Sequence, residues 1–465
     1  MGGVMRTLAV GALALVLAGP ALAAQDGNEV RDPALDELIE ILRQRGVLEA
    51  RDEQAIEQAA AEDPAWYEKL AQRIDLWGDF RGRYEYFSFF DDPINADRNL
   101  PDRHRLRYRL RLNAKGRVND YAEAFVRLAT GNDSRTTNQT FGDGVDFATN
   151  EIYLDKAYVR VSPFANGALP DGDGSFWGYF GRTEQPWRWG VYKDWIWDDE
   201  LAPAGVYLQG DKQLDEAFQL FSNAGFYVID ENGTSKDPMM FSGQLGFHAK
   251  PVPESDEDLR FDYGSKLSLF NFFNLDAAFI QRGVDSSGVP SPTFAAGNTL
   301  GGLTGDVTGG HTSVLELGSY VTLHLIDQWP ITLHGNISYN FGAENVWVVN
   351  PVTSPLPGTF RADSEPIFWL VGIAAGDKKE IVKLGMSYAW MEANAFPAQF
   401  IDSDLHDGLT NRKGFVWSAT RSVMKNADVI LTAFLSDSIE NGAAYVNSLA
   451  GSDRFRLQAN FVLSF

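Results

Sequence analysis

Residues 103–112 read RHRLRYRLRL, a stretch with arginine at every second position. Because successive side chains of a β-strand point to opposite faces, this spacing places all five arginines on one face. The other face carries His104, Tyr108 and three leucines. A strand of this kind needs a polar environment on one side and an apolar environment on the other. The arginine face consists of Arg103, Arg105, Arg107, Arg109 and Arg111.

The same period of two runs from residue 74 to the end of the chain, with clear examples at 331–341 and 453–465. Short connections alternate with long polar stretches, and this sorting is typical of a bacterial outer-membrane barrel rather than a soluble sandwich. We therefore expect an all-β fold, a closed antiparallel transmembrane β-barrel of about 16 strands. The expected strands are 74–87, 103–115, 121–130, 151–162, 176–183, 205–221, 225–231, 239–249, 259–282, 312–326, 331–342, 366–376, 380–392, 413–422, 427–437 and 453–465.

The connections of this barrel are expected to be short on the periplasmic side and long on the outer side. The expected tight turns are 116–120, 222–225, 327–330, 376–380 and 423–426. The expected long loops are 88–102, 131–150, 184–204, 283–312, 343–365, 393–412 and 438–452.

The sequence predicts that the chain is divided into three segments. Residues 1–23 carry a short apolar run and small residues at Ala21 and Ala23, which predicts a cleaved signal peptide. In residues 24–73 the apolar period is 3.6, and Gly46 suits a helix end, so we expect a short N-terminal periplasmic helical segment. Whether this leader packs as a plain helical hairpin, forms a plug or supports self-association stays open. Residues 74–465 form the barrel.

Composition excludes several classes of protein. The chain has 465 residues and no cysteine, so disulfides and thiol catalysis are excluded. A formal net charge of −23 argues against nucleic acid as a partner. A hydrophobic content of 44% argues against extended disorder.

The chain resembles the Gram-negative outer-membrane putative porin family, relatives of the larger substrate-selective porins. The similarity covers most of residues 30–465 and is carried by residues 38–48, 104–115, 153–160 and 197–206, with the terminal Phe465 on an alternating strand. The resemblance implies passive diffusion of small solutes through a homo-oligomer, a trimer being one possibility. It does not identify the solute.

The arginine face cannot point at lipid, where each arginine at mid-depth would cost roughly 2–4 kcal/mol. We expect it to face the lumen, with Arg81 and Arg83 of the preceding strand beside it. One interpretation is a basic ladder that passes anionic groups between guanidinium groups, whose planar fork binds carboxylate or phosphate. The alternative is a row neutralised by acids on facing strands, for which Asp79, Glu85 and Glu123 are the candidates.

A second feature is the stretch 185–200, which holds four of the twelve tryptophans. An exposed loop has little reason to carry so much aromatic surface. It is expected either to fold into the barrel as a constriction loop or to contribute to an interfacial girdle or a trimer contact. The candidate constriction residues are Trp187, Trp189, Trp195, Trp197, Asp198, Asp199 and Glu200.

The sequence supplies no catalytic or metal-binding motif, and we expect neither an enzyme nor a cofactor. The sequence thus predicts an outer-membrane porin for small hydrophilic solutes, biased towards anionic or carboxylate-bearing ones, in contact with outer-membrane lipid and lipopolysaccharide. Two alternatives are a sugar channel that uses the loop tryptophans and a structural or adhesion barrel with a plugged lumen.

Overall fold

The computed structural model describes residues 73–90, 102–131, 136–142, 150–231, 233, 236–250, 260–275, 312–325, 329–343, 346–350, 358–362, 364–440 and 453–465. The expected signal peptide and nearly all of the expected helical leader lie outside these residues. Within them, no helix has the length and apolar character needed to cross a membrane.

The chain divides into two compact units, one of residues 1–76 with 114–118 and one of residues 77–113 with 119–465. In the first unit, the described residues include an ion pair of 2.8 Å between Lys115 and Asp75. The backbone N–H of Arg117 also donates to the Arg73 carbonyl.

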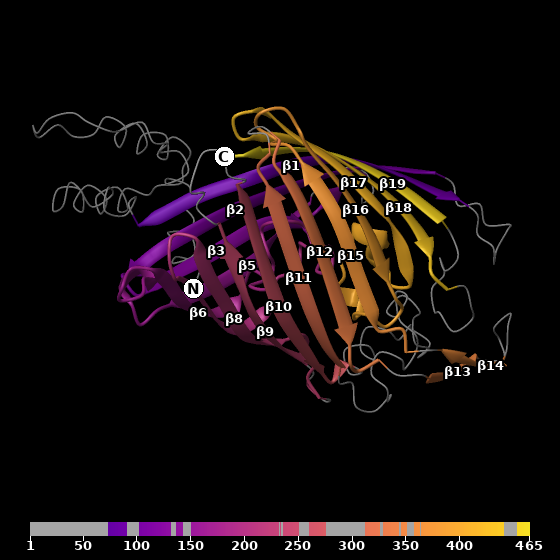
Figure 1. The fold of residues 1–465 in the computed structure, drawn as a ribbon, viewed down its shortest axis with the longest axis horizontal. Helices are drawn as coiled ribbons and strands as arrows, with labels where there is room; N and C mark the ends of the chain where they lie inside the picture. Colours follow the sequence, from indigo (N-terminus) through magenta and orange to yellow (C-terminus); the bar gives the residue numbers. More distant parts are fainter. Residues whose placement is uncertain are drawn as a thin grey trace, which may run out of the picture. The chain divides into compact units, whose positions relative to one another are not determined.

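The strands form a closed antiparallel barrel of 16 strands, which confirms the expected fold class (Figure 1). Neighbouring strands follow one another in the chain, and β19 pairs with β1 to close the cylinder. The barrel strands are β1 (Ile74–Phe90), β2 (Arg103–Asn119), β3 (Ala122–Gly131), β5 (Glu151–Val161), β6 (Gly174–Arg182), β7 (Ala204–Gln213), β8 (Phe218–Val228), β9 (Met239–Ala249), β10 (Phe261–Phe273), β11 (Thr312–Leu323), β12 (Ile331–Asn340), β15 (Ile367–Ala375), β16 (Lys383–Met391), β17 (Arg412–Met424), β18 (Ala427–Ser438) and β19 (Asp453–Ser464).

Among the described residues, three shorter strands and three one-turn 3₁₀ helices lie in the connections. The two-residue β4 (Gln139–Thr140) pairs with β2, and β13 (Val346–Asn350) pairs with β14 (Gly358–Ala362) in a hairpin of its own. The 3₁₀ helices are η1 (Ala165–Gly167), η3 (Ala398–Phe400) and η4 (Leu405–Gly408).

Alternation along the strands sorts the side chains into an outer apolar face and an inner polar face. Leu245, Leu267, Leu317 and Ile337 are cross-strand partners on β9 to β12, and each exposes 47–62% of its surface. The inner residues next to them are buried, namely Gln244, Lys266, Ser268, Glu316 and Asn336. This pattern is that of a barrel that meets lipid on its outside and polar groups on its inside.

One predicted turn is wrong. The stretch 222–225 was expected to be a tight connection, but it lies inside β8, and the turn between β7 and β8 is at residues 214–217. The Asp215 side chain accepts the backbone N–H of Ala217, and Leu214 donates its N–H to the Phe218 carbonyl. An aspartate that satisfies its own turn outweighs the small residues Ser222 and Gly225 as a turn signal.

We predict that Leu245→Arg, on the outer face of β9, lowers the free energy of unfolding by roughly 2–4 kcal/mol, because a guanidinium group would then face lipid. The matched change Leu214→Arg, in the turn after β7, should cost only about 0–1 kcal/mol. Urea titration of both variants in lipid vesicles measures the difference. Equal losses at the two positions would contradict the assigned outer face.

Candidate functional site

The predicted arginine row lies on the inner face of β2. Leu106 and Leu112, on the opposite face, expose 51% and 41% of their surface. Along the row, side-chain exposure is 18% for Arg105, 11% for Arg107 and 8% for Arg109. Arg111 is also partly covered, whereas Arg103 is exposed at the end of the strand, with its guanidinium group 6.0 Å from the Phe87 ring centre.

Two neighbouring strands add arginines to the same wall. Arg81 and Arg83 project from β1, as expected, and Arg456 projects from β19. Arg456 was not among the predicted residues. It joins the row because β19 closes the barrel against β1, where Arg456 is the register partner of Phe87.

Two strand carboxylates neutralise part of this wall. Asp79 lies 2.7 Å from both Arg109 and Arg111. Glu85, which is fully buried, lies 2.6 Å from Arg105 and 3.8 Å from Arg107. The contacts of Asp79 and Glu85 are those expected for a row neutralised by acids on a facing strand.

The third predicted acid, Glu123, does not reach the row. It pairs with Arg160 of β5 at 2.6 Å instead.

The segment between β6 and β7, residues 183–203, is called the first insert. Its four tryptophans are buried, with exposures of 1% for Trp187, 7% for Trp189, 9% for Trp195 and 3% for Trp197. Trp187 packs edge-on against Phe270 of β10, an inner residue with no exposed surface. These tryptophans therefore contact inward-facing residues of the barrel.

Buried polar contacts fix the first insert to the wall of β8 to β11. Lys266 of β10 pairs with Asp194 of the insert at 3.2 Å and with Glu316 of β11 at 3.0 Å. Gln244 donates its amide to the Trp187 carbonyl at 2.8 Å, and Asn223 donates to the Pro186 carbonyl at 3.0 Å.

A second segment also folds inward, namely residues 392–411 between β16 and β17, called the second insert. It pairs with the first insert through an isolated antiparallel bridge between Trp197 and Ile401. The Asp198 N–H donates to the Phe400 carbonyl at 3.0 Å, and the Asp402 N–H donates to the Ile196 carbonyl at 3.2 Å.

The sequence predicts only a long polar loop at 393–412, where the second insert lies. Its buried Phe396, Ile401 and Leu405 are the signal that could have revealed it, since a solvated loop gains nothing from such residues.

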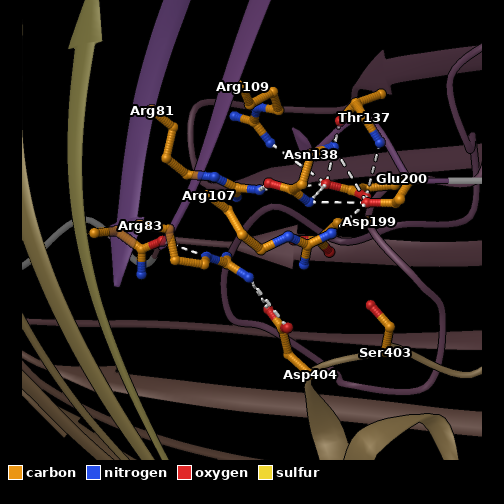
Figure 2. A network of polar contacts seen from close by, with 12 residues as sticks. Arg81, Arg83, Arg107, Arg109, Thr137, Asn138, Asp199, Glu200, Ser403 and Asp404 are labelled. Carbon is orange, nitrogen blue, oxygen red and sulfur yellow. Dashed lines mark hydrogen bonds and ion pairs between the residues drawn. The ribbon is translucent and has the colours of Figure 1, made fainter. Parts of the chain in front are cut away.

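The first insert brings one carboxylate to the arginine wall, Glu200, and the second brings two, Asp404 and Asp407; Figure 2 shows Glu200 and Asp404. Glu200 of the first insert lies 3.3 Å from Arg81 and 4.0 Å from Arg109. Asp404 of the second insert lies 3.2 Å from Arg83 and 2.8 Å from Arg456. The arginine wall and the two inserts thus meet at ion pairs.

The carboxylates of Glu200 and Asp404 are ionised at neutral pH. Burial alone would raise the pKa of Glu200, but Arg81 and the hydrogen bond from Thr136 hold that pKa below its usual value. Burial would likewise raise the pKa of Asp404, but Arg83 and Arg456 lower it well below its usual value.

The remaining predicted acids of the first insert, Asp198 and Asp199, make other contacts than ion pairs with the arginine wall. Asp199 pairs with Arg188 at 2.6 Å and with Lys193 at 3.3 Å. Asp198 accepts the backbone N–H groups of Glu200 and Ser403, at 2.8 and 3.2 Å. They shape the junction of the two inserts.

The wall keeps an excess of positive charge. The described residues place seven guanidinium groups in ion pairs with five carboxylates, an excess of two cations. One of the five carboxylates, Asp407, also pairs with Arg454, which is not among the seven guanidinium groups. Including Arg454 would therefore raise the excess of cations. The cations are Arg81, Arg83, Arg105, Arg107, Arg109, Arg111 and Arg456, and the anions are Asp79, Glu85, Glu200, Asp404 and Asp407.

Comparison with known families gives one match, in which residues 92–280 fit the model of the family described as "Putative porin". This segment is therefore similar to the putative porin family. The match includes the arginine strand β2 and the first insert, and the barrel is accordingly an outer-membrane barrel with a porin-like channel fold. The comparison with curated proteins finds no match.

Three solved structures are similar to this chain at low sequence identity. OprB of Pseudomonas putida, determined at high pH, is 11% identical over 86% of this chain and 96% of its own, with a TM-score of 0.48. OmpF of Salmonella typhi in complex with daunomycin is 12% identical over 84% and 97%, with a TM-score of 0.45. The outer membrane channel DcaP of Acinetobacter baumannii is 13% identical over 84% and 97%, with a TM-score of 0.39.

In the part of the chain that the structure describes, no group of three or more His, Asp or Glu side chains could hold a metal ion. The polar chemistry of the site is that of ion pairs and hydrogen bonds.

We predict that Lys266→Met lowers the free energy of unfolding by roughly 3–5 kcal/mol, because Asp194 and Glu316 would remain buried without their cation. Lys413→Met is the matched control, since Lys413 is 31% exposed and lies 3.7 Å from the half-exposed Asp437. It should cost no more than about 1 kcal/mol. Urea titration in vesicles compares the two variants, and a loss at Lys266 as small as the one at Lys413 would contradict the assigned anchor.

Proposed function

We propose that the barrel carries small hydrophilic solutes across the outer membrane by passive diffusion and favours anionic, carboxylate-bearing ones. The observation that carries the proposal is the excess of guanidinium groups over carboxylates on the wall of β1, β2 and β19. Charged groups in a narrow passage with low-dielectric walls raise the local concentration of the opposite charge. The net charge of −23 belongs to the whole chain and does not set the field inside the barrel.

The ladder interpretation and the neutralised-row interpretation both describe part of this wall. Asp79 and Glu85 pair with Arg105, Arg109 and Arg111. Arg107 is held more loosely, 3.8 Å from Glu85, and also donates to the Thr136 hydroxyl at 3.2 Å. A wall with shared carboxylates and an excess of arginine supports weak, successive anion contacts, as conduction requires.

The sugar-channel alternative receives less support. Stacking of a sugar ring needs an aromatic face that is free in the lumen. Trp187 contacts Trp197, Tyr227 and Phe270, and Trp197 contacts Phe396 and Phe400. Both indole rings are almost wholly buried by these contacts, so neither offers a platform for a solute.

The plugged-barrel alternative has a specific observation in its favour. The two paired inserts reach from Lys266 on β10 to the arginines of β1 and β19, so they bridge the interior. Single-channel conductance decides between a narrowed pore and a plug. Homo-oligomer formation, including a trimer, and contact with lipopolysaccharide stay predictions from the family resemblance.

We predict that the purified protein in planar bilayers under a KCl gradient has a reversal potential that favours chloride. The triple change Arg105→Gln, Arg107→Gln and Arg109→Gln should lower the chloride-to-potassium permeability ratio by roughly threefold or more, because three lumenal charges are lost. The control removes three cations at the β15–β16 and β17–β18 turns, Lys378, Lys379 and Lys425, and should have a small effect. A strong cation preference that the arginine changes leave unaltered would contradict the proposal.

A further inference from the structure

The Glu200 carboxylate sits in a set of hydrogen-bond donors that together resemble a binding site for a free carboxylate. Asn138 Nδ2 lies 2.6 Å from Oε1, and the Thr136 hydroxyl lies 2.6 Å from Oε2. The Thr137 N–H donates to Oε2 at 3.1 Å and its hydroxyl donates to Oε1 at 3.2 Å. The positive charge comes from Arg81 at 3.3 Å and Arg109 at 4.0 Å. We call Arg81, Arg109, Thr136, Thr137 and Asn138 the cradle (Figure 2).

The cradle is held together by contacts that do not involve Glu200. Arg81 donates to the side-chain Oδ1 of Asn138, and Arg107 donates to the Thr136 hydroxyl at 3.2 Å. The Asn138 N–H donates to that same hydroxyl at 3.2 Å. The Thr130 hydroxyl fixes the Thr137 carbonyl at 2.9 Å. The donors are therefore pre-organised, which is what a binding site for an external group requires.

Glu200 itself belongs to a different part of the chain. The cradle comes from β1, β2 and the segment before β4, whereas Glu200 stands near the end of the first insert. The insert keeps its place through Asp194, Trp187 and Pro186, which contact the opposite wall. The Glu200 side chain can thus leave the cradle while these anchors remain formed.

We propose that the cradle is a binding site for the carboxylate group of a passing solute, and that Glu200 is a tethered competitor that occupies it between passages. This inference rests on the proposed function, because it names the site at which the favoured anion binds. A tethered group competes at an effective concentration of about millimolar or above. A free carboxylate therefore binds weakly to the resting protein, which suits a pore whose solutes must also leave.

The test measures block of chloride current by acetate in planar bilayers, with Glu200→Ala as the main variant. Removal of the competitor leaves the donors free, so the acetate concentration for half-block should fall at least tenfold relative to the unchanged protein. Glu184→Ala is the matched control, since Glu184 lies on the same insert, carries the same charge and pairs with Arg127 and Lys156 outside the cradle. The acetate concentration for half-block of this control should stay within about twofold of the value for the unchanged protein.

A second pair of variants keeps the inference testable if Glu200→Ala fails to insert. Glu200→Gln preserves shape and should lower the half-block concentration by a smaller factor in the same direction. Adding Asn138→Ala to either Glu200 variant removes the closest donor and should restore weak block. Equal half-block in the Glu200 and Glu184 variants, or tight block that survives Asn138→Ala, overturns the inference.

The two proposals fail in different ways. A Glu200→Ala pore that prefers chloride but shows no saturable acetate block retains the proposed function and overturns the cradle. A pore that prefers potassium both before and after the arginine changes overturns the proposed function itself.

Discussion

The structure depends on the rule that, in a strand that crosses lipid, every second side chain must avoid the membrane. On β2 this rule requires the side chains of Arg105, Arg107 and Arg109 to point into the barrel interior. Once several guanidinium groups share the interior, the fold must supply anions near them. Asp79 and Glu85 do so from β1, and Glu200 and Asp404 do so from the two inserts. The ion pairs between the inserts and the wall are thus a consequence of the charge that the barrel cannot place elsewhere.

Apolar packing is the second reason why the two inserts fold into the barrel. Inner positions of the barrel carry Phe270, Phe368 and Leu370, none of which has exposed surface. Aromatic rings of the two inserts cover this side of the interior, and they form one buried cluster with these residues. The aromatic rings of the inserts thus pack against apolar inner residues on one side, while Glu200 and Asp404 pair with arginines of β1 and β19 on the other.

Much of the barrel could be predicted from the sequence, because alternation is a local property and lipid enforces it along every strand. The β7–β8 turn was misplaced, since Asp215 and Ser222 offer competing turn signals and only strand pairing decides between them. The arginine row and the first insert were predicted from local patterns. The second insert, Arg456 and the donors around Glu200 were missed, because those contacts join residues separated by 52 to 371 positions in the chain.

The most direct test uses the absence of cysteine in the chain, which allows single-cysteine variants without further changes. Arg107→Cys and Leu106→Cys are adjacent on β2 and differ only in the face that they occupy. In vesicle-inserted protein, a membrane-impermeant charged thiol reagent should modify position 107 and lower the chloride current, and it should leave position 106 unmodified. Modification at 106 with protection at 107 would contradict a barrel whose arginine face lines a water-accessible interior.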